Sequence, residues 1–367
     1  MRRPAQPGRP VVVKVGSSSL TGEDGTLSAA AVARTARQVA GVMDLGFPAV
    51  LVSSGAVAAG FPRMGLRRRP TDLPGLQAAA AVGQGLLMER YAAEFASLGR
   101  VVGQVLLTKD ILANRDQYLH AREALQRLLD LGIVPIVNEN DTVVVDELKV
   151  GDNDSLAAIV GHLVAAGMLI VLTDTPGLFA GDPRFEDDPE FIDAVRHTDE
   201  VLDSLLHGDP GPLGSGGVAT KVAAARMAAW SGIPTVIAAS GAADVLDAAV
   251  RGDSVGTWVE PHRSSIGARK LWIAFGLPAA GTITVDDGAA AAIVAGGKSL
   301  LPAGVRNLSG DFAAGAAVEV AAPGRGLIGK GLVRLAAPDL RAVLGLHSSD
   351  AGGEVIHRDD LVVLVAG

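Results

Sequence analysis

The sequence contains no cysteine, few aromatic residues and no long uncharged hydrophobic run. Without cysteine the chain cannot form a disulfide, a zinc ribbon or a thiol nucleophile, so any metal must be held by oxygen or histidine ligands. Lys and Arg number 32 against 40 Asp and Glu, and the resulting net charge of −8 disfavours a protein that coats nucleic acid. These absences are typical of a cytoplasmic enzyme.

The N-terminus lacks the features of a leader or a membrane anchor. Residues 1–10 carry three arginines and three prolines, and the apolar run that follows is short and interrupted by Lys14. Elsewhere no uncharged stretch reaches the roughly 20 residues that a membrane-spanning helix needs. We therefore expect a flexible tail over residues 1–10 and a soluble protein with no membrane association.

Hydrophobic patterning over residues 11–262 predicts an α/β domain, in which short apolar runs alternate with longer helical stretches. Strands are expected at 10–15, 49–53, 101–107, 134–138, 169–173, 234–238 and 256–259. Helices are expected after Ser28, which is placed to cap one that ends near Gly46, and at 76–98, 116–131, 154–166 and 219–230. This order predicts a mainly parallel sheet covered by helices on both faces, with a ligand crevice along the carboxyl edge of the strands.

The pattern changes after residue 262. Residues 263–275 contain basic residues followed by Trp272 and Phe275, and we expect them to be a linker. From residue 276 onward, glycine-rich turns separate β-like runs, which are TITVD (282–286), AAVEVA (316–321), LIGKGLVRL (327–335) and LVVLVAG (361–367). The sequence therefore predicts a second, small, mostly β domain over 276–367.

Lys14 lies in the middle of the valine run 11–15. A lysine in a strand buried on both faces is costly unless an anion meets it. Gly16 follows directly and lets a ligand approach the backbone, while Ser17 to Ser19 supply hydroxyl and amide donors. Two interpretations remain: a phosphate site charged by Lys14, or a lysine whose ammonium reaches water at the sheet margin.

Two further segments place small or polar residues after predicted strand ends. In VLVSSGAVAAG (50–60), small residues open space at a helix N-terminus, although an ordinary strand–helix turn has the same composition. VPIVNENDTVVVDELKVGDNDSLAAIV (134–160) holds two clusters of acids and amides, more than helix capping by Asp154 or Ser155 requires. Such clusters suit an amino group, a lysine or Mg²⁺.

The segments VLTDTPGLFAGDPR (171–184) and LGSGGVATKVAAARMA (213–228) belong together. Thr173 and Asp174 end a strand, and a glycine-rich loop that ends in Lys221 opens a helix. This second combination of glycines and lysine is typical of a phosphate site. GSGGVA follows no strand and GGKS (296–299) lacks the first glycine of a P-loop, so neither a Rossmann nor a P-loop fold is predicted.

These segments occur in an order and spacing that resemble the amino acid kinase family. The resemblance rests on KVGSSSL (14–20), VSSGAVAAG (52–60), NENDTV (138–143), KVGDNDSLAAIV (149–160), LTDTPGLFAGDPR (172–184) and GSGGVATK (214–221). Within that family it is similar to the branch that phosphorylates the γ-carboxylate of L-glutamate in the first step of proline synthesis. The C-terminal segment resembles a PUA domain.

The resemblance implies roles for individual residues. Lys14 and Lys221 would be catalytic and meet the ATP phosphates, and Asp154 would orient the two lysines. The amino-acid substrate would be held by Ser54, Gly55, Asp141 and Asn153. The ATP-binding set would be Lys14, Gly16, Thr173, Asp174, Ser215, Gly216, Gly217, Val218, Ala219, Thr220 and Lys221. Two positions depart from the family pattern, Phe179 in place of a tyrosine and Val218 in place of a methionine.

The implied chemistry agrees with these residue types. A free γ-carboxylate has a pKa of about 4.3, so at neutral pH it is already a nucleophile and needs no general base. No histidine occurs in any of the motifs. Catalysis would then consist of positioning and charge neutralisation during an in-line transfer from ATP, with Mg²⁺ as cofactor.

The resemblance further implies proline as feedback inhibitor, a homo-oligomer with a tetramer favoured, and transient contact with glutamyl phosphate reductase. Two alternatives remain. One is another kinase of the family, acting on acetylglutamate, aspartate or uridylate. The other is an RNA-binding PUA protein, which the charge from residue 275 onward disfavours, because seven Lys and Arg stand against nine Asp and Glu.

Overall fold

The computed structural model describes residues 2–112, 114–143, 153–181, 188–199, 201–202, 205, 217–263, 265–346 and 353–365. The chain forms two compact units, residues 1–265 and residues 266–367. Among the described helices, none combines the length and apolarity of a membrane-spanning segment.

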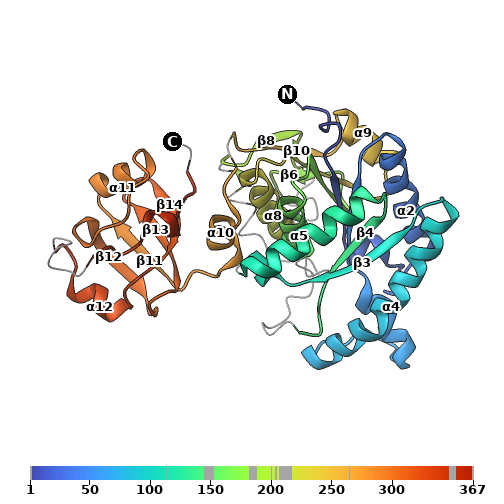
Figure 1. The fold of residues 1–367 in the computed structure, drawn as a ribbon, viewed down its shortest axis with the longest axis horizontal. Helices are drawn as coiled ribbons and strands as arrows, with labels where there is room; N and C mark the ends of the chain where they lie inside the picture. Colours follow the sequence, from blue (N-terminus) through green and yellow to red (C-terminus); the bar gives the residue numbers. More distant parts are fainter. Residues whose placement is uncertain are drawn as a thin grey trace. The chain divides into compact units, whose positions relative to one another are not determined.

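The first unit is built on one large sheet (Figure 1). Its strands are β1 (Val11–Val15), β2 (Ala49–Ser53), β3 (Val102–Leu107), β4 (Val134–Glu139), β5 (Met168–Thr173), β8 (Ala194–Arg196), β9 (Thr235–Ala239) and β10 (Thr257–Glu260). They lie in the order β3-β4-β2-β1-β5-β9-β10-β8. From β3 to β9 all neighbours are parallel, and β10 is antiparallel to β9. The central strands β1, β2, β4 and β5 are buried throughout, as expected for valine-rich strands covered on both faces.

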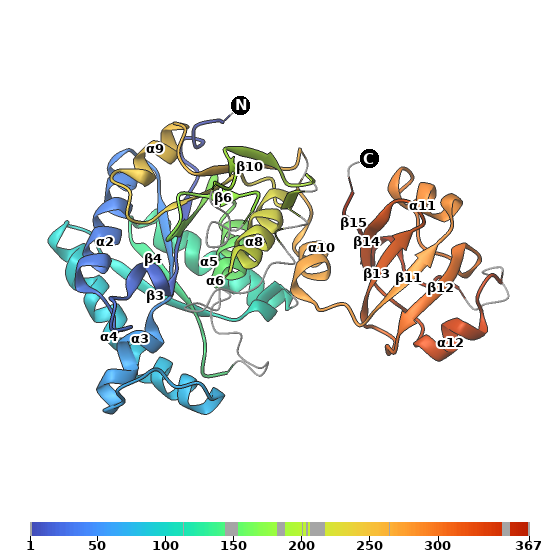
Figure 2. The ribbon, with the colours of Figure 1, turned by 180° about the vertical axis from the view of Figure 1, so that it is seen from behind.

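Helices cover both faces of this sheet (Figures 1 and 2). One layer holds α2 (Ala29–Asp44), α4 (Leu73–Ser97) and α9 (Val245–Arg251), and the other holds α5 (Arg115–Asp130), α6 (Asn153–Leu163) and α8 (Val218–Trp230). Shorter elements are α1 (Ser17–Leu20), α3 (Ala56–Gly60), η1 (Phe61–Met64), η2 (Lys109–Leu112), β6 (Leu178–Phe179) and β7 (Phe191–Ile192). Helix α2 begins as predicted, because the Ser28 hydroxyl accepts a hydrogen bond from the N–H of Ala31.

The predicted fold class is confirmed. Each predicted strand of the first unit agrees with an observed one to within a residue at either end, and each predicted helix to within three residues. Among the described elements of this unit, the strands β6, β7 and β8, the helices α1 and α9 and the 3-10 helices η1 and η2 were not predicted. The missed strands are two or three residues long, too short for an apolar alternation to be recognised in the sequence.

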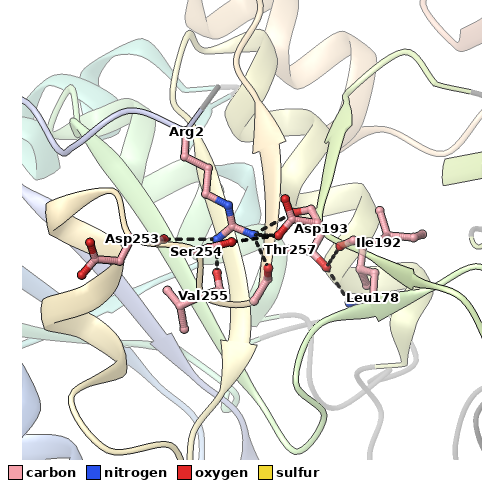
Figure 3. Close-up of polar contacts among 9 residues, drawn as sticks. Arg2, Leu178, Ile192, Asp193, Asp253, Ser254, Val255 and Thr257 are labelled. Atoms are coloured by element: carbon pink, nitrogen blue, oxygen red, sulfur yellow. Dashed lines mark hydrogen bonds and ion pairs between the residues drawn. The ribbon is translucent and has the colours of Figure 1, made fainter.

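The N-terminal segment differs from the flexible tail that we expected. The Arg2 guanidinium donates to the carbonyls of Asp253, Val255 and Gly256 and to the carboxylate of Asp193 (Figure 3). Ala5 is buried, and its N–H donates to the carbonyl of Val250. The described residues 2–10 are therefore anchored, because a run of outward-facing carbonyls offers acceptors that a guanidinium fits.

The second unit contains a five-stranded sheet in the order β12-β11-β13-β14-β15. Its strands are β11 (Gly281–Val285), β12 (Val305–Gly310), β13 (Ala317–Ala322), β14 (Gly326–Leu332) and β15 (Leu361–Val363), and its helices are α10 (Ala268–Leu271), η3 (Trp272–Gly276), α11 (Asp287–Val294), η4 (Pro302–Gly304), α12 (Ala337–Ala342) and η5 (Arg358–Asp360). The small, mostly β architecture is confirmed. Strand β12 was not predicted, because this edge strand is polar and mostly exposed.

Part of the expected linker 263–275 packs within the second unit. Ile273 and Ala274 are buried in a cluster with Val362. The Lys330 ammonium donates to the carbonyls of Ala274 and Leu277. The unit therefore begins at residue 266, ahead of the expected boundary at residue 276.

Candidate active site

The carboxyl edge of the sheet contains a switch in strand order. From β1 the chain moves to β2 and β4 on one side, and it later returns to place β5 on the other side of β1. Loops that leave β1 and β5 therefore diverge, and in open parallel sheets this divergence forms the ligand crevice. The first three sequence motifs and the Thr173-Asp174 pair all follow strands at this edge.

Lys14, Asp154 and Lys221 meet at this edge. Lys14 is on β1, Asp154 is in the first turn of α6, and Lys221 is in the first turns of α8. The Lys14 Nζ lies 2.6 Å from Asp154 Oδ1, and the Lys221 Nζ lies 3.4 Å from Asp154 Oδ2. The Thr220 hydroxyl donates to the same Oδ2 over 2.7 Å. Two lysines separated by more than 200 residues thus share one carboxylate.

This cluster buries charges of both signs next to one another. Asp154 is fully buried, and both lysines are exposed by less than a tenth of their surface. Burial alone would raise the pKa of Asp154, but the ammoniums of Lys14 and Lys221 outweigh it and hold that pKa below its usual value. Burial lowers the pKa of Lys221, and the attraction of Asp154 opposes this shift. The charge of Asp174 also opposes the lowering, so two ammoniums and two carboxylates act on one another in this cluster. Buried ammoniums at the carboxyl edge of a sheet suit an anionic ligand.

Gly16 leaves little space beside the Lys14 ammonium. A Cβ atom at Gly16 would lie 3.2 Å from the Lys14 Nζ, so a side chain there would require the ammonium to shift by a few tenths of an ångström. Ser17 to Ser19 form the short helix α1, in which Ser19 is buried. The sequence predicted donors here, and it did not predict that they would be helical.

A second group of polar side chains lies on the β2 and β4 side of the edge. The Asn153 Nδ2 donates to Ser54 Oγ and to Asn138 Oδ1, each over 2.9 Å. Ser54, Asn138 and Asn153 are all buried. Gly55, which follows Ser54, has a φ of 109°, a left-handed conformation that favours glycine. Asp154 and Ser155, suggested as helix caps, lie inside α6, and Asp154 binds the lysines instead.

Asp141 lies in the turn after β4 and is half-buried. Burial raises its pKa to about 6, and the positive charge of Arg69 partly opposes this shift. The carboxylate of Asp141 is therefore close to its protonation point near neutral pH. Arg69, in the segment before α4, has no counterpart among the residues that the sequence singled out.

Apart from Lys14 and Gly16, the predicted nucleotide-binding residues that the structure describes lie at the end of β5 and at the start of α8. Thr173 and Asp174 end β5, and the Thr173 hydroxyl donates to Asp174 Oδ1 over 3.0 Å. Gly217, Val218, Ala219, Thr220 and Lys221 form the start of α8, and Val218 is exposed. Ser215 and Gly216 lie outside the described residues. Phe179 packs edge-on against Phe191, with ring centroids 5.4 Å apart.

Two side chains of α4 were missed by the sequence analysis. Gln84 Oε1 accepts from the Nδ2 of Asn138 over 2.8 Å. The Tyr91 hydroxyl lies 2.9 Å from Ser53 Oγ, and burial raises the pKa of Tyr91. The signal that the sequence offered was a polar residue, Gln84, within the alanine-rich run 76–98. The sequence did not show which face of this helix packs against the sheet, so it could not place Gln84 beside β4.

No group of three His, Asp or Glu side chains with metal-binding geometry occurs in the described part of the chain. Both oxygens of Asp154 are already engaged by the lysines and Thr220. Fold and site together define an α/β protein of the class that keeps a ligand site at the carboxyl edge of its sheet, here with a buried lysine cluster beside a buried group of amide and hydroxyl side chains.

Comparisons with known proteins agree with this class. Residues 9–239 match the model of the amino acid kinase family, and residues 281–352 match that of the PUA domain. A glutamate 5-kinase from Marinomonas sp. is 43% identical over 99% of this chain and 100% of its own length. A glutamate 5-kinase from Moorella thermoacetica is 43% identical over 97% of this chain and 96% of its own length.

A solved structure of UMP kinase from Bacillus anthracis has the same fold, with a TM-score of 0.50 and 15% identity. It covers 71% of this chain and 99% of its own. The chain therefore belongs to the amino acid kinase family, among its glutamate 5-kinases that carry a C-terminal PUA domain.

Proposed function

We propose that the chain transfers the γ-phosphoryl group of ATP to the γ-carboxylate of L-glutamate, the first step of proline synthesis. The observation that carries this proposal is the convergence of Lys14 and Lys221 on the buried Asp154. Glutamate enters as the substrate because full-length relatives are glutamate 5-kinases. The neighbouring amide and hydroxyl groups of Asn153 and Ser54 are of the types that bind an amino acid.

The chemistry needs charge neutralisation more than acid–base catalysis. The glutamate γ-carboxylate is ionised at neutral pH and attacks the γ-phosphorus without losing a proton. One of its oxygens forms the new bond as the bond to the ADP oxygen breaks. Attacking group and phosphates are all negative, so the barrier includes their mutual repulsion. In this scheme the positive charges of Lys14 and Lys221 offset that repulsion. The ion pairs with Asp154 keep the two ammonium groups in fixed positions.

The remaining predicted residues divide between the two substrates. Ser54, Gly55, Asp141 and Asn153 are proposed to hold glutamate, with the Asp141 carboxylate opposite its α-ammonium group. Thr173, Asp174 and the start of α8 are proposed to hold ATP. This division is supported by the placement of the first group after β2 and β4 and of the second after β5 and at α8.

Magnesium enters this proposal only as a companion of ATP. The described residues offer no three-ligand cluster, and Asp154 is committed to the lysines. Mg²⁺ usually keeps several waters and binds substrate phosphates, so it needs few protein ligands. When bound, it would neutralise charge on the β- and γ-phosphates.

The test is ADP release from ATP that depends on added glutamate, with the acyl phosphate trapped by hydroxylamine. Acetylglutamate, aspartate and UMP serve as competing acceptors. We expect turnover with glutamate and at least 100-fold less with each of the others. Equal turnover with any of them, or none with glutamate, would remove the proposed substrate.

Three further expectations belong to the same proposal. Added proline should inhibit the reaction, the chain should form a homo-oligomer with a tetramer favoured, and the product should pass to glutamyl phosphate reductase during a transient contact. Proline titration of the assay and light scattering test the first two. A cytoplasmic location also stays a prediction.

An RNA-binding role for the second unit has weak electrostatic support. Arg306, Arg334 and Arg358 each lie within 4 Å of a carboxylate, on Asp286, Glu354 and Asp359 respectively. Basic side chains paired in this way contribute less to phosphate binding. A salt-dependent gel shift with RNA would reveal a basic surface if one exists.

A further inference from the structure

A chain of amide hydrogen bonds connects α4 with the proposed glutamate site. Asn153 Nδ2 donates to Asn138 Oδ1 over 2.9 Å, and Asn138 Nδ2 donates to Gln84 Oε1 over 2.8 Å. The three residues come from α6, β4 and α4, and are separated by up to 69 positions in the sequence. Gln84 is absent from every motif that predicted the site.

The polarity of this chain is fixed by one backbone group. The N–H of Glu139 donates to Asn138 Oδ1 over 2.9 Å, and a backbone N–H can only donate. The oxygen of Asn138 must therefore face Glu139 and Asn153, and its nitrogen must face Gln84. Gln84 in turn must present its oxygen, because a second nitrogen would place donor against donor.

The same polarity determines what Asn153 offers to a substrate. Both of its N–H groups are used, one by Ser54 Oγ and one by Asn138 Oδ1. Its Oδ1 is buried and has no hydrogen-bond partner among the described residues. A buried acceptor without a partner is costly, roughly 1–3 kcal/mol. An ammonium group of an amino-acid substrate is a donor that would satisfy it.

Gln84 reaches Asn138 because α3 and α4 cross at very close range. A Cβ atom at Gly60 would lie 1.9 Å from the carbonyl oxygen of Ala79, and one at Gly83 would lie 1.8 Å from that of Ala56. Only glycine is tolerated at both positions. Gln84 follows Gly83 directly, so the close crossing of the two helices determines how near its side chain comes to Asn138.

We infer that Gln84 is a positioning residue for the amino-acid substrate, which acts by anchoring Asn138 so that Asn153 turns its oxygen toward the substrate ammonium. The inference rests on the proposed function. Without the acceptor of Gln84, the buried Nδ2 of Asn138 loses its partner, and the amide is held only by the two hydrogen bonds that its oxygen accepts from Glu139 and Asn153. The amide then twists to bring Nδ2 toward another acceptor. That twist weakens the hydrogen bond from Asn153 to Oδ1, and the Asn153 amide can then turn its nitrogen toward the site.

The test is Gln84→Met, which keeps the length of the side chain and removes the acceptor. We expect the KM for glutamate to rise about tenfold, while the KM for ATP and kcat stay within about twofold. Gln126→Met is the matched control, because Gln126 is an exposed helical glutamine hydrogen-bonded to Asp130. It should leave all three constants unchanged.

A double-mutant cycle separates positioning from packing. If Gln84 acts through Asn138, then Gln84→Met has no further effect on kcat/KM for glutamate in an Asn138→Ala background. Should Gln84→Met fail to fold, Gln84→Ala removes the same acceptor and replaces it in the cycle. Additive losses, equal rises in the KM values of both substrates, or an unchanged KM for glutamate would each overturn the inference. Wild-type enzyme without glutamate-dependent ADP release would instead overturn the proposed function.

Discussion

Each unit of this protein buries lysine ammonium groups, and their partners differ. In the first unit, Lys14 and Lys221 share the carboxylate of Asp154. In the second unit, Lys330 donates to two backbone carbonyls, those of Ala274 and Leu277. Carbonyl dipoles satisfy the hydrogen bonds of a lysine and hold two chain segments together. Two ammoniums beside one shared carboxylate, with Asp174 also attracting Lys221, form instead a cluster of interacting charges.

The comparison shows why burial of a lysine does not by itself indicate a functional site. Lys330 is as buried as Lys221, with 8% against 9% of its surface exposed, and burial lowers the pKa of both. What distinguishes Lys221 is the second ammonium beside it. Variants that change the balance of charge should therefore affect catalysis, and those that change carbonyl contacts should affect stability.

The largest expected effect is that of Lys221→Met. This change keeps the apolar part of the side chain and removes one of the two positive charges at the proposed phosphate site. We expect kcat/KM to fall by about 10³-fold or more, as for the loss of a group that stabilises developing negative charge. Lys14→Met should behave alike. Near-normal turnover by either folded variant, measured as glutamate-dependent ADP release, would contradict the assigned role.

Asp154→Asn removes the carboxylate that Lys14 and Lys221 share, and so it makes the charge of the cluster more positive, whereas the lysine variants make it more negative. Removing one partner of a buried ion pair costs about 3 kcal/mol, because both ammoniums lose their carboxylate. We expect a lower Tm without ligand. ATP should then raise the Tm of the variant by more than that of the wild type, since the phosphates replace the lost charge. Thermal shift with and without ATP measures both, and equal shifts would show that the lysines do not face the nucleotide.

The sequence predicted the sheet and Lys14 for the same reason. Valine-rich strands buried on both faces are recognisable from residue type alone, and Lys14 is conspicuous inside one of them. The meeting of Lys14 with Lys221 came only from the family resemblance, since no local pattern relates residues 207 positions apart. The structure supplies it through the strand order and the packing of α6 against α8.

Gln84, Arg69 and the anchored Arg2 could not be predicted, because each depends on long-range packing. Gln84 requires the depth of the α3–α4 crossing, and Arg2 requires carbonyls that the turn 253–256 exposes. Their residue types carry no signal, since glutamine and arginine are common on exposed helices and tails. The edge strand β12 was missed because its exposed side chains are those of a loop.

A smaller effect is expected from pH, through the protonation of Asp141 in the proposed glutamate site. Burial raises the pKa of Asp141 to about 6, so protonation below pH 6 removes the carboxylate proposed to hold the α-ammonium group. The KM for glutamate should rise up to tenfold for each pH unit below 6, while the KM for ATP should change little. Arg69→Leu removes a charge that favours the ionised form, and it should move this limb to higher pH. A limb that stays near pH 4 would exclude Asp141.

The smallest expected effect is that of Lys330→Met, the matched counterpart of Lys221→Met. The carbonyls of Ala274 and Leu277 lose their donor, which costs roughly 1–3 kcal/mol each, and the removal of a buried ammonium offsets part of that cost. We expect a net loss of about 1 kcal/mol, seen as faster amide hydrogen exchange in η3 and β14. Glutamate-dependent turnover should stay within twofold of wild type, because Lys330 offers its charge to carbonyls and not to a substrate. A large loss of turnover with normal exchange protection would mean that the contrast between the two kinds of buried lysine is mistaken.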